Sequence, residues 1–103
     1  MNSVQTALRR LILIIDDEQD TTLSLQIALQ LEGFDVDVFY DPHKALLNFR
    51  PLYYNLILMD ICKPGLTGFH LAERIREKDN FVKICFMTRF EVYYRSLGNS
   101  ILP

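Results

Sequence analysis

Three short, almost unbroken apolar runs constrain the fold of this chain more than any other feature of its sequence. They are Leu11–Ile15, Leu56–Met59 and Val82–Met87, and runs of this kind predict strands that are covered on both faces. A fourth run, Phe34–Phe39, alternates apolar and acidic residues, which is typical of a strand with only one covered face. We expect this alternating strand to lie at an edge of the sheet.

Helical patterns separate the strands and follow the last of them. Each pattern begins at a capping side chain, a proline, a glycine or an apolar residue at helical spacing, and the expected starts are Asp20 or Thr21, Asp41-Pro42, Thr67 or Gly68, and Phe90. The first helix is expected to run to Glu32 and stop at Gly33, the second to end at about Phe49, and the last to end at Leu97. Alternating strands and helices predict an α/β fold with a doubly wound parallel sheet.

Composition and charge narrow the class of protein. The 103 residues are half hydrophobic, with a formal net charge of -2, so we expect one globular domain, and the acidic balance argues against a nucleic-acid partner. The apolar runs are much shorter than a membrane span, and the N-terminus lacks the apolar stretch of a signal peptide. With only Cys62 and Cys85, a disulfide framework is not indicated, and we expect a cytoplasmic protein with no membrane partner.

Carboxylates follow two of the predicted strands. Asp16 and Asp17 come directly after Ile15, and Asp60 comes directly after Met59. Taken singly, an aspartate in such a place more often serves as a turn or helix cap. Parallel strands bring their carboxyl ends to one edge of the sheet, where α/β folds bind ligands. Three carboxylates there repel one another unless a cation compensates, and an open acidic cleft suits Mg²⁺ and phosphoryl chemistry.

Thr88 adds a hydroxyl at the end of the strand Val82–Met87. A threonine in this place can hydrogen-bond a phosphoryl oxygen, although taken singly it more often caps the next helix. The joint placement of acids and hydroxyl after three strands favours a site.

Three segments carry a family resemblance. LILIIDDE, LILMDICKPGLTG and VKICFMT resemble the signature segments of response-regulator receiver domains, the phosphoacceptor modules of two-component signalling. The resemblance implies a flavodoxin-like fold over residues 11–97, with residues 1–10 as an N-terminal extension and residues 98–103 as a tail. It implies that Asp60 accepts the phosphoryl group, that Asp16, Asp17, Asp60 and the backbone carbonyl of Cys62 hold Mg²⁺, and that Thr88 is the switch hydroxyl. The implied partners are a histidine kinase and a downstream effector protein.

The C-terminal part of the sequence departs from the receiver pattern. Receivers have a fifth strand that ends in a lysine, followed by a fifth helix, whereas here too few residues follow Thr88 and the last lysine is Lys83. We therefore expect four of the usual five strands. Arg89 stands where receivers have a small residue, and three roles for it stay open: supplying positive charge to the phosphoryl group, screening the site, or pointing to solvent.

These departures keep a second hypothesis open, in which the chain is a truncated or degenerate receiver that binds proteins without being phosphorylated. A magnesium-dependent phosphatase is disfavoured. Such an enzyme has a second aspartate two residues after its aspartyl nucleophile, whereas Asp16 and Asp17 are adjacent. His43 and His70 are far apart in sequence, and we expect neither to bind metal.

The first helix carries more apolar surface than one sheet contact requires. Its two apolar stripes are Leu23, Ile27 and Leu31, and Leu25, Ala28 and Leu29. Without a fifth helix, we expect one stripe and the edge of the fourth strand to be exposed. This predicts either a homo-oligomer or a marginally stable chain.

Overall fold

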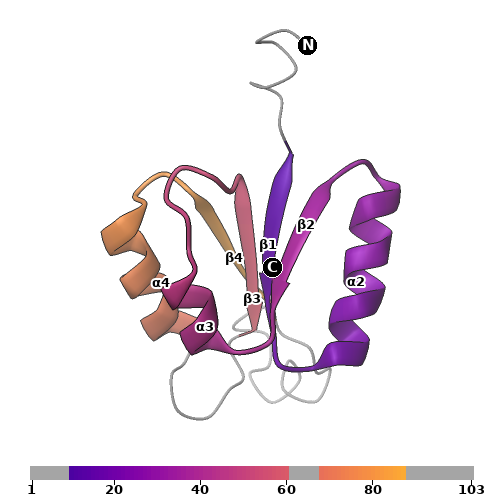
Figure 1. The fold of residues 1–103 in the computed structure, drawn as a ribbon, viewed down its shortest axis with the longest axis horizontal. Helices are drawn as coiled ribbons and strands as arrows, with labels where there is room; N and C mark the ends of the chain where they lie inside the picture. The colour runs from indigo at the N-terminus through magenta and orange to yellow at the C-terminus, as the bar shows by residue number, and fades with distance from the viewer. Residues whose placement is uncertain (1–9, 61–67, 88–103) are drawn as a thin grey trace, which may run out of the picture.

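The strands form one parallel sheet with helices on both of its faces (Figure 1). The computed structural model describes residues 10–60 and 68–87, and the expectations for Cys62, Thr88, Arg89 and a helix at Phe90–Leu97 lie outside them. The strands are β1 (Leu11–Ile15), β2 (Asp35–Phe39), β3 (Leu56–Asp60) and β4 (Lys83–Met87), and the helices are α2 (Gln19–Leu31), α3 (Pro42–Leu47) and α4 (Gly68–Lys78).

The strand order is β2-β1-β3-β4, and every neighbouring pair is parallel. This confirms the predicted sheet and places the alternating strand β2 at an edge. In the register, Ile15 of β1 lies opposite Met59 of β3. The residues that follow this pair, Asp16 and Asp60, are therefore brought to the same end of two adjacent strands.

The core lies mainly between the sheet and the helices α3 and α4, which cover the same face (Figure 1). Alternate residues of β1 point into this core and pack with Ile57 and Met59 of β3, with Ala45 of α3, and with Leu71 and Ile75 of α4. The other β1 residues, Ile12 and Ile14, are buried on the opposite face, on the side of α2. Burial on both faces is what the unbroken apolar run of β1 predicts.

The helix α2 begins earlier than expected and is only partly covered. Its N-cap is Glu18 rather than Asp20 or Thr21, so the prediction of the cap was wrong. The helix ends as expected before Gly33, whose φ of +94° is a left-handed conformation that glycine adopts without strain. Within the described residues, the stripe of Leu23, Ile27 and Leu31 is exposed by 52%, 48% and 83%, which confirms the expected exposed stripe.

The two helices on the other face begin as predicted. The carboxylate of Asp41 accepts a hydrogen bond of 2.8 Å from the backbone N–H of His43, and Pro42 occupies the first turn of α3. This helix ends at Leu47, two residues before the expected end. In α4, which has Gly68 as its first residue, Leu71 and Ile75 are buried as expected.

The fourth strand is less buried than its sequence predicts. It begins at Lys83 rather than Val82, and Cys85 and Phe86 are exposed. The expectation that this run is covered on both faces was therefore wrong. In the part of the chain that the structure describes, β4 is at the edge of the sheet and pairs only with β3, and its faces are less covered than those of β1 and β3.

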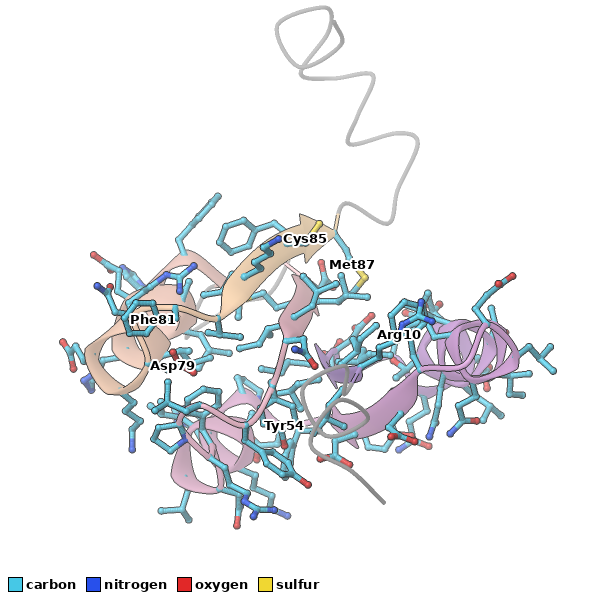
Figure 2. All side chains as sticks on the ribbon, turned by 90° about the horizontal axis from the view of Figure 1, so that it is seen from above. Arg10, Tyr54, Asp79, Phe81, Cys85 and Met87 are labelled. Carbon is cyan, nitrogen blue, oxygen red and sulfur yellow. The ribbon has the colours of Figure 1, made fainter. Side chains whose placement is uncertain are left out.

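The amino ends of β3 and β4 are joined through Asp79. This carboxylate is 3% exposed and accepts hydrogen bonds from the backbone N–H groups of Leu52, Phe81 and Val82. Figure 2 looks onto this end of the sheet, with Asp79 and Phe81 at the connection between α4 and β4. Leu52 has a φ of 58°, in the left-handed region that costs a residue with a Cβ about 1–2 kcal/mol.

Tyr54 is a second buried polar group near this end (Figure 2). Its hydroxyl donates a hydrogen bond of 2.9 Å to Asp37 in β2. Burial, followed by this hydrogen bond to Asp37, raises the pKa of Tyr54 above its ordinary value. Among the described helices, none has the length and apolar character that crossing a membrane requires.

Candidate metal and phosphoacceptor site

The carboxyl ends of β1 and β3 bring together three acids that are distant in sequence. One carboxylate oxygen from each of Asp16, Asp17 and Asp60 can be chosen so that all three atoms lie within 4.8 Å of one another. Asp60 is the last residue of β3, and Asp16 and Asp17 follow β1 directly. The structure therefore confirms that these three predicted site residues share one place.

The three acids differ in their exposure to solvent. Asp16 and Asp60 are each 1% exposed, while Asp17 is exposed. Burying a carboxylate is costly unless hydrogen bonds or a cation compensate for the lost water. Two buried carboxylates beside a third that reaches solvent form a negative cluster that a cation can approach from outside.

Backbone hydrogen bonds fix the turn that carries Asp16. Its backbone N–H donates to the carbonyl oxygen of Phe39 in β2 at 3.1 Å, which extends the pairing of β1 and β2 by one residue. Its carboxylate Oδ1 accepts from the backbone N–H of Glu18 at 3.1 Å. A short acidic side chain that bonds the backbone two residues ahead is a common way to turn a chain out of a strand. The sequence Asp-Asp-Glu thus ends β1 and starts α2 within three residues.

The donor set fits a hard divalent cation. Carboxylate oxygens are the side-chain ligands that Mg²⁺ prefers, and it binds through one or two of them together with water or phosphate oxygens. Three carboxylate oxygens within 4.8 Å meet this need, and a cation there would offset their mutual repulsion. Neither His43 nor His70 belongs to this cluster.

Two of the expected site residues, Cys62 and Thr88, lie outside the described residues. The structure adds participants that the sequence did not reveal. The Phe39 carbonyl anchors Asp16 from the neighbouring strand, and a backbone carbonyl carries no signal in a sequence. The hydroxyl of Thr22 bonds the Glu18 carbonyl, and the available signal was a threonine four residues after an acidic residue at a helix start.

Known proteins are similar to this chain in sequence. The response regulator receiver domain family matches residues 12–95 of the chain. The transcriptional regulatory protein TrcR of Mycobacterium tuberculosis is 32% identical over 77 residues, which are 75% of this chain and 30% of the relative. The response regulator ArlR of Staphylococcus aureus is 30% identical over 87 residues, which are 84% of this chain and 40% of the relative. The chain thus spans less than half the length of these curated relatives.

Solved structures agree with this match. The response regulator protein TrrA of Thermotoga maritima, in complex with Mg²⁺-BeF, is 34% identical, with a TM-score of 0.71 over 88% of this chain and 78% of that chain. A complex of the histidine kinase ThkA with TrrA gives 32% identity and the same TM-score and coverage. The family match spans most of the chain and includes the strands that carry Asp16, Asp17 and Asp60. The chain belongs to the response regulator receiver domain family.

Proposed function

We propose that this domain accepts a phosphoryl group from a histidine kinase on the carboxylate of Asp60. An oxygen of Asp60 attacks the phosphorus of a phosphohistidine, a new O–P bond forms, and the P–N bond breaks with its electron pair leaving on the imidazole nitrogen. The product is an acyl phosphate on Asp60 and a free histidine on the kinase. The observation that carries this proposal is the close cluster of Asp60 with Asp16 and Asp17 in a chain of the receiver family.

The residues that would hold Mg²⁺ are Asp16, Asp17 and Asp60, together with the backbone carbonyl of Cys62. When bound, the cation supplies positive charge against the phosphoryl oxygens. The relative TrrA was solved with Mg²⁺-BeF, which supports this choice of cation. Asp16 and Asp17 contribute by placing their charges beside Asp60, and the burial of Asp16 and Asp60 limits the access of water to that side of the cluster.

The partners and the output are proposed on the same basis. TrrA forms a complex with a histidine kinase, and we infer a kinase of this class as the phosphoryl donor here. Phosphorylation is proposed to act through the hydroxyl of Thr88 on the surface that a downstream effector protein reads. A cytoplasmic location, a possible homo-oligomer, and a receiver region over residues 11–97 with flanking segments at 1–10 and 98–103 stay predictions.

Phosphorylation of the purified chain by a small-molecule donor tests this proposal directly. With acetyl phosphate or phosphoramidate and Mg²⁺, we expect intact-mass spectrometry to show one added phosphoryl group. Hydroxylamine should remove that group, because it cleaves acyl phosphates. The group should not appear without Mg²⁺ or in Asp60→Asn. Asp35→Asn, which removes an exposed carboxylate of β2, is the matched control and should be labelled like the wild type.

Two results would contradict the proposal. Labelling that persists in Asp60→Asn would place the acceptor elsewhere. A folded wild-type chain that takes no label with Mg²⁺ and either donor would favour the alternative function, a receiver fold that binds proteins without being phosphorylated.

A further inference from the structure

The buried face of α2 contains a hydroxyl where packing alone would favour an apolar side chain. Thr22 is 1% exposed and is the buried residue of this helix. Its Oγ1 donates a hydrogen bond of 2.6 Å to the backbone carbonyl of Glu18. A buried hydroxyl costs free energy unless it is bonded, so the bond to Glu18 is what makes a threonine acceptable here.

Glu18, which accepts the hydrogen bond from Thr22, also donates a hydrogen bond to Asp16 of the acidic cluster. Glu18 accepts two hydrogen bonds on its carbonyl oxygen, from Oγ1 of Thr22 and from the backbone N–H of Thr22 at 3.0 Å. Its own N–H donates to Oδ1 of Asp16 at 3.1 Å. Glu18 is the N-cap, with extended rather than helical backbone angles, so the helix holds its carbonyl through the backbone N–H of Thr22. The Thr22 hydroxyl adds a second hold on this residue.

A second hydroxyl in α2 makes the same kind of bond with no link to the site. Ser24 Oγ donates to the carbonyl oxygen of Asp20 at 3.2 Å, and this bond is exposed to solvent. Hydroxyl bonds to the carbonyl four residues earlier are common in helices. Of these two hydroxyls, only that of Thr22 belongs to a buried residue and bonds Glu18, whose N–H donates to Asp16. Ser24 is therefore a built-in control.

We propose that Thr22 is a positioning residue for Asp16. Its hydroxyl holds Glu18 so that the Glu18 N–H keeps the Asp16 carboxylate oriented for Mg²⁺. This role rests on the proposed function, because it assigns Thr22 to the magnesium site of the phosphoacceptor. Residues that orient a metal ligand through hydrogen bonds commonly change metal affinity by an order of magnitude or more when they are removed.

The test uses three variants of the full chain. Thr22→Val keeps the shape and β-branching and removes the hydroxyl, Thr22→Ser keeps the hydroxyl, and Ser24→Ala removes the control hydroxyl. Calorimetric titration with Mg²⁺ should give a dissociation constant that is roughly threefold to tenfold higher in Thr22→Val, less than the loss of a direct partner of a ligand would cause, because Thr22 acts on Asp16 through Glu18. Thr22→Ser and Ser24→Ala should bind Mg²⁺ like the wild type.

Two further measurements are made without metal. The urea midpoint of unfolding should not fall in Thr22→Val, because the Glu18 carbonyl keeps its bond from the Thr22 N–H and no polar group is left unpaired. The amide hydrogen of Glu18 should exchange several-fold faster by NMR in Thr22→Val than in the wild type or Thr22→Ser. A loss of metal affinity without a loss of stability is what a purely structural role of Thr22 would not produce.

The outcomes separate this inference from the proposed function. Unchanged Mg²⁺ affinity in Thr22→Val, an equal loss in Ser24→Ala, or a Thr22→Val chain that does not fold would overturn the positioning role. A wild type that binds no Mg²⁺ would overturn both proposals. A wild type that binds Mg²⁺ with the expected loss in Thr22→Val, but takes no phosphoryl label, would overturn the phosphoacceptor function alone.

Discussion

The two ends of the sheet both hold buried carboxylates, but the groups around these carboxylates differ. At the amino end, Asp79 is 3% exposed and accepts three backbone N–H hydrogen bonds of 2.9–3.1 Å. At the carboxyl end, Asp16 and Asp60 are buried to a similar degree, and carboxylate oxygens of these two residues and of Asp17 lie within 4.8 Å of one another. One end neutralises a charge within the fold, whereas the other gathers like charges.

The pKa of Asp79 reflects the backbone donors around its carboxylate. Burial alone would raise it, but the N–H groups of Phe81, Leu52 and Val82 and the positive charge of Arg76 outweigh burial and hold the pKa below its ordinary value. Backbone donors favour the ionised form because they point at the carboxylate in the folded state. The comparison teaches that burial alone does not mark a functional acid. What distinguishes the two ends is that Asp79 accepts three backbone N–H bonds, whereas Asp16, Asp17 and Asp60 place carboxylate oxygens close to one another.

The largest expected effect is on stability and comes from Asp79→Asn. The amide keeps one acceptor oxygen but directs an NH₂ group toward backbone donors, so we expect the free energy of unfolding to fall by about 3 kcal/mol. Urea unfolding followed by circular dichroism in metal-free buffer measures this change. Glu77→Gln, an exposed carboxylate of α4, is the matched control and should change the free energy by less than about 0.5 kcal/mol. An equal effect of both variants would contradict the role assigned to Asp79.

The second prediction concerns Asp60→Asn, which should act in the opposite direction. Removing one of three clustered charges relieves repulsion, so we expect metal-free stability to be equal to or higher than that of the wild type. The wild type should gain about 1.4 kcal/mol when free Mg²⁺ is at tenfold the dissociation constant, and the variant should lose most of this gain. Thermal unfolding with and without Mg²⁺ checks both parts. A strong destabilisation of metal-free Asp60→Asn would break the contrast between the two ends.

A third carboxylate sharpens the comparison because it accepts a single backbone bond. Asp41 lies after β2, at the carboxyl end of the sheet, and caps α3 through His43. We expect Asp41→Ala to lower the free energy of unfolding by about 1 kcal/mol, less than Asp79→Asn. Asp41→Ser retains a capping oxygen and should restore most of the loss. Urea unfolding measures both, and an Asp41→Ala effect as large as that of Asp79→Asn would show that the number of N–H donors does not set the scale.

The smallest expected effect is a dependence on pH. Because the folded-state pKa of Asp79 lies below its ordinary value of 3.8, its contribution to stability is present above that value and is lost as the pH falls through the folded-state pKa. The difference in unfolding free energy between wild type and Asp79→Asn should be constant from neutral pH to about pH 5 and shrink below about pH 4. Urea unfolding across this range provides the measurement. A difference that does not change with pH would contradict the assignment.

Much of the carboxyl end could be predicted from the sequence. The apolar runs identified β1 and β3, parallel strands place their last residues together, and Asp16, Asp17 and Asp60 follow from that geometry. The start of α3 was predictable because Asp41 and Pro42 act within one turn of the helix. These inferences succeed because each depends on local sequence or on a general rule of sheet topology.

The amino end could not be predicted in the same way. In sequence, Asp79 lies between Lys78 and Asn80, in a polar stretch that resembles an exposed turn. One of the three N–H groups that bond its carboxylate belongs to Leu52, which is 27 residues away. The exposed edge of β4 was expected, but the coverage of both its faces was wrongly predicted, because an apolar run cannot show which other elements pack over a strand. Contacts between distant segments decide both cases.

The left-handed backbone of Leu52 ties two positions of the chain together in their tolerance of change. Its φ of 58° costs stability, and its N–H bond to Asp79 compensates for part of that cost. Glycine at position 52 would remove the cost of the left-handed backbone and lessen the need for the carboxylate. Effects at positions 52 and 79 are therefore expected to be non-additive. We expect receiver domains without an acid at the position of Asp79 to have glycine more often at the position of Leu52.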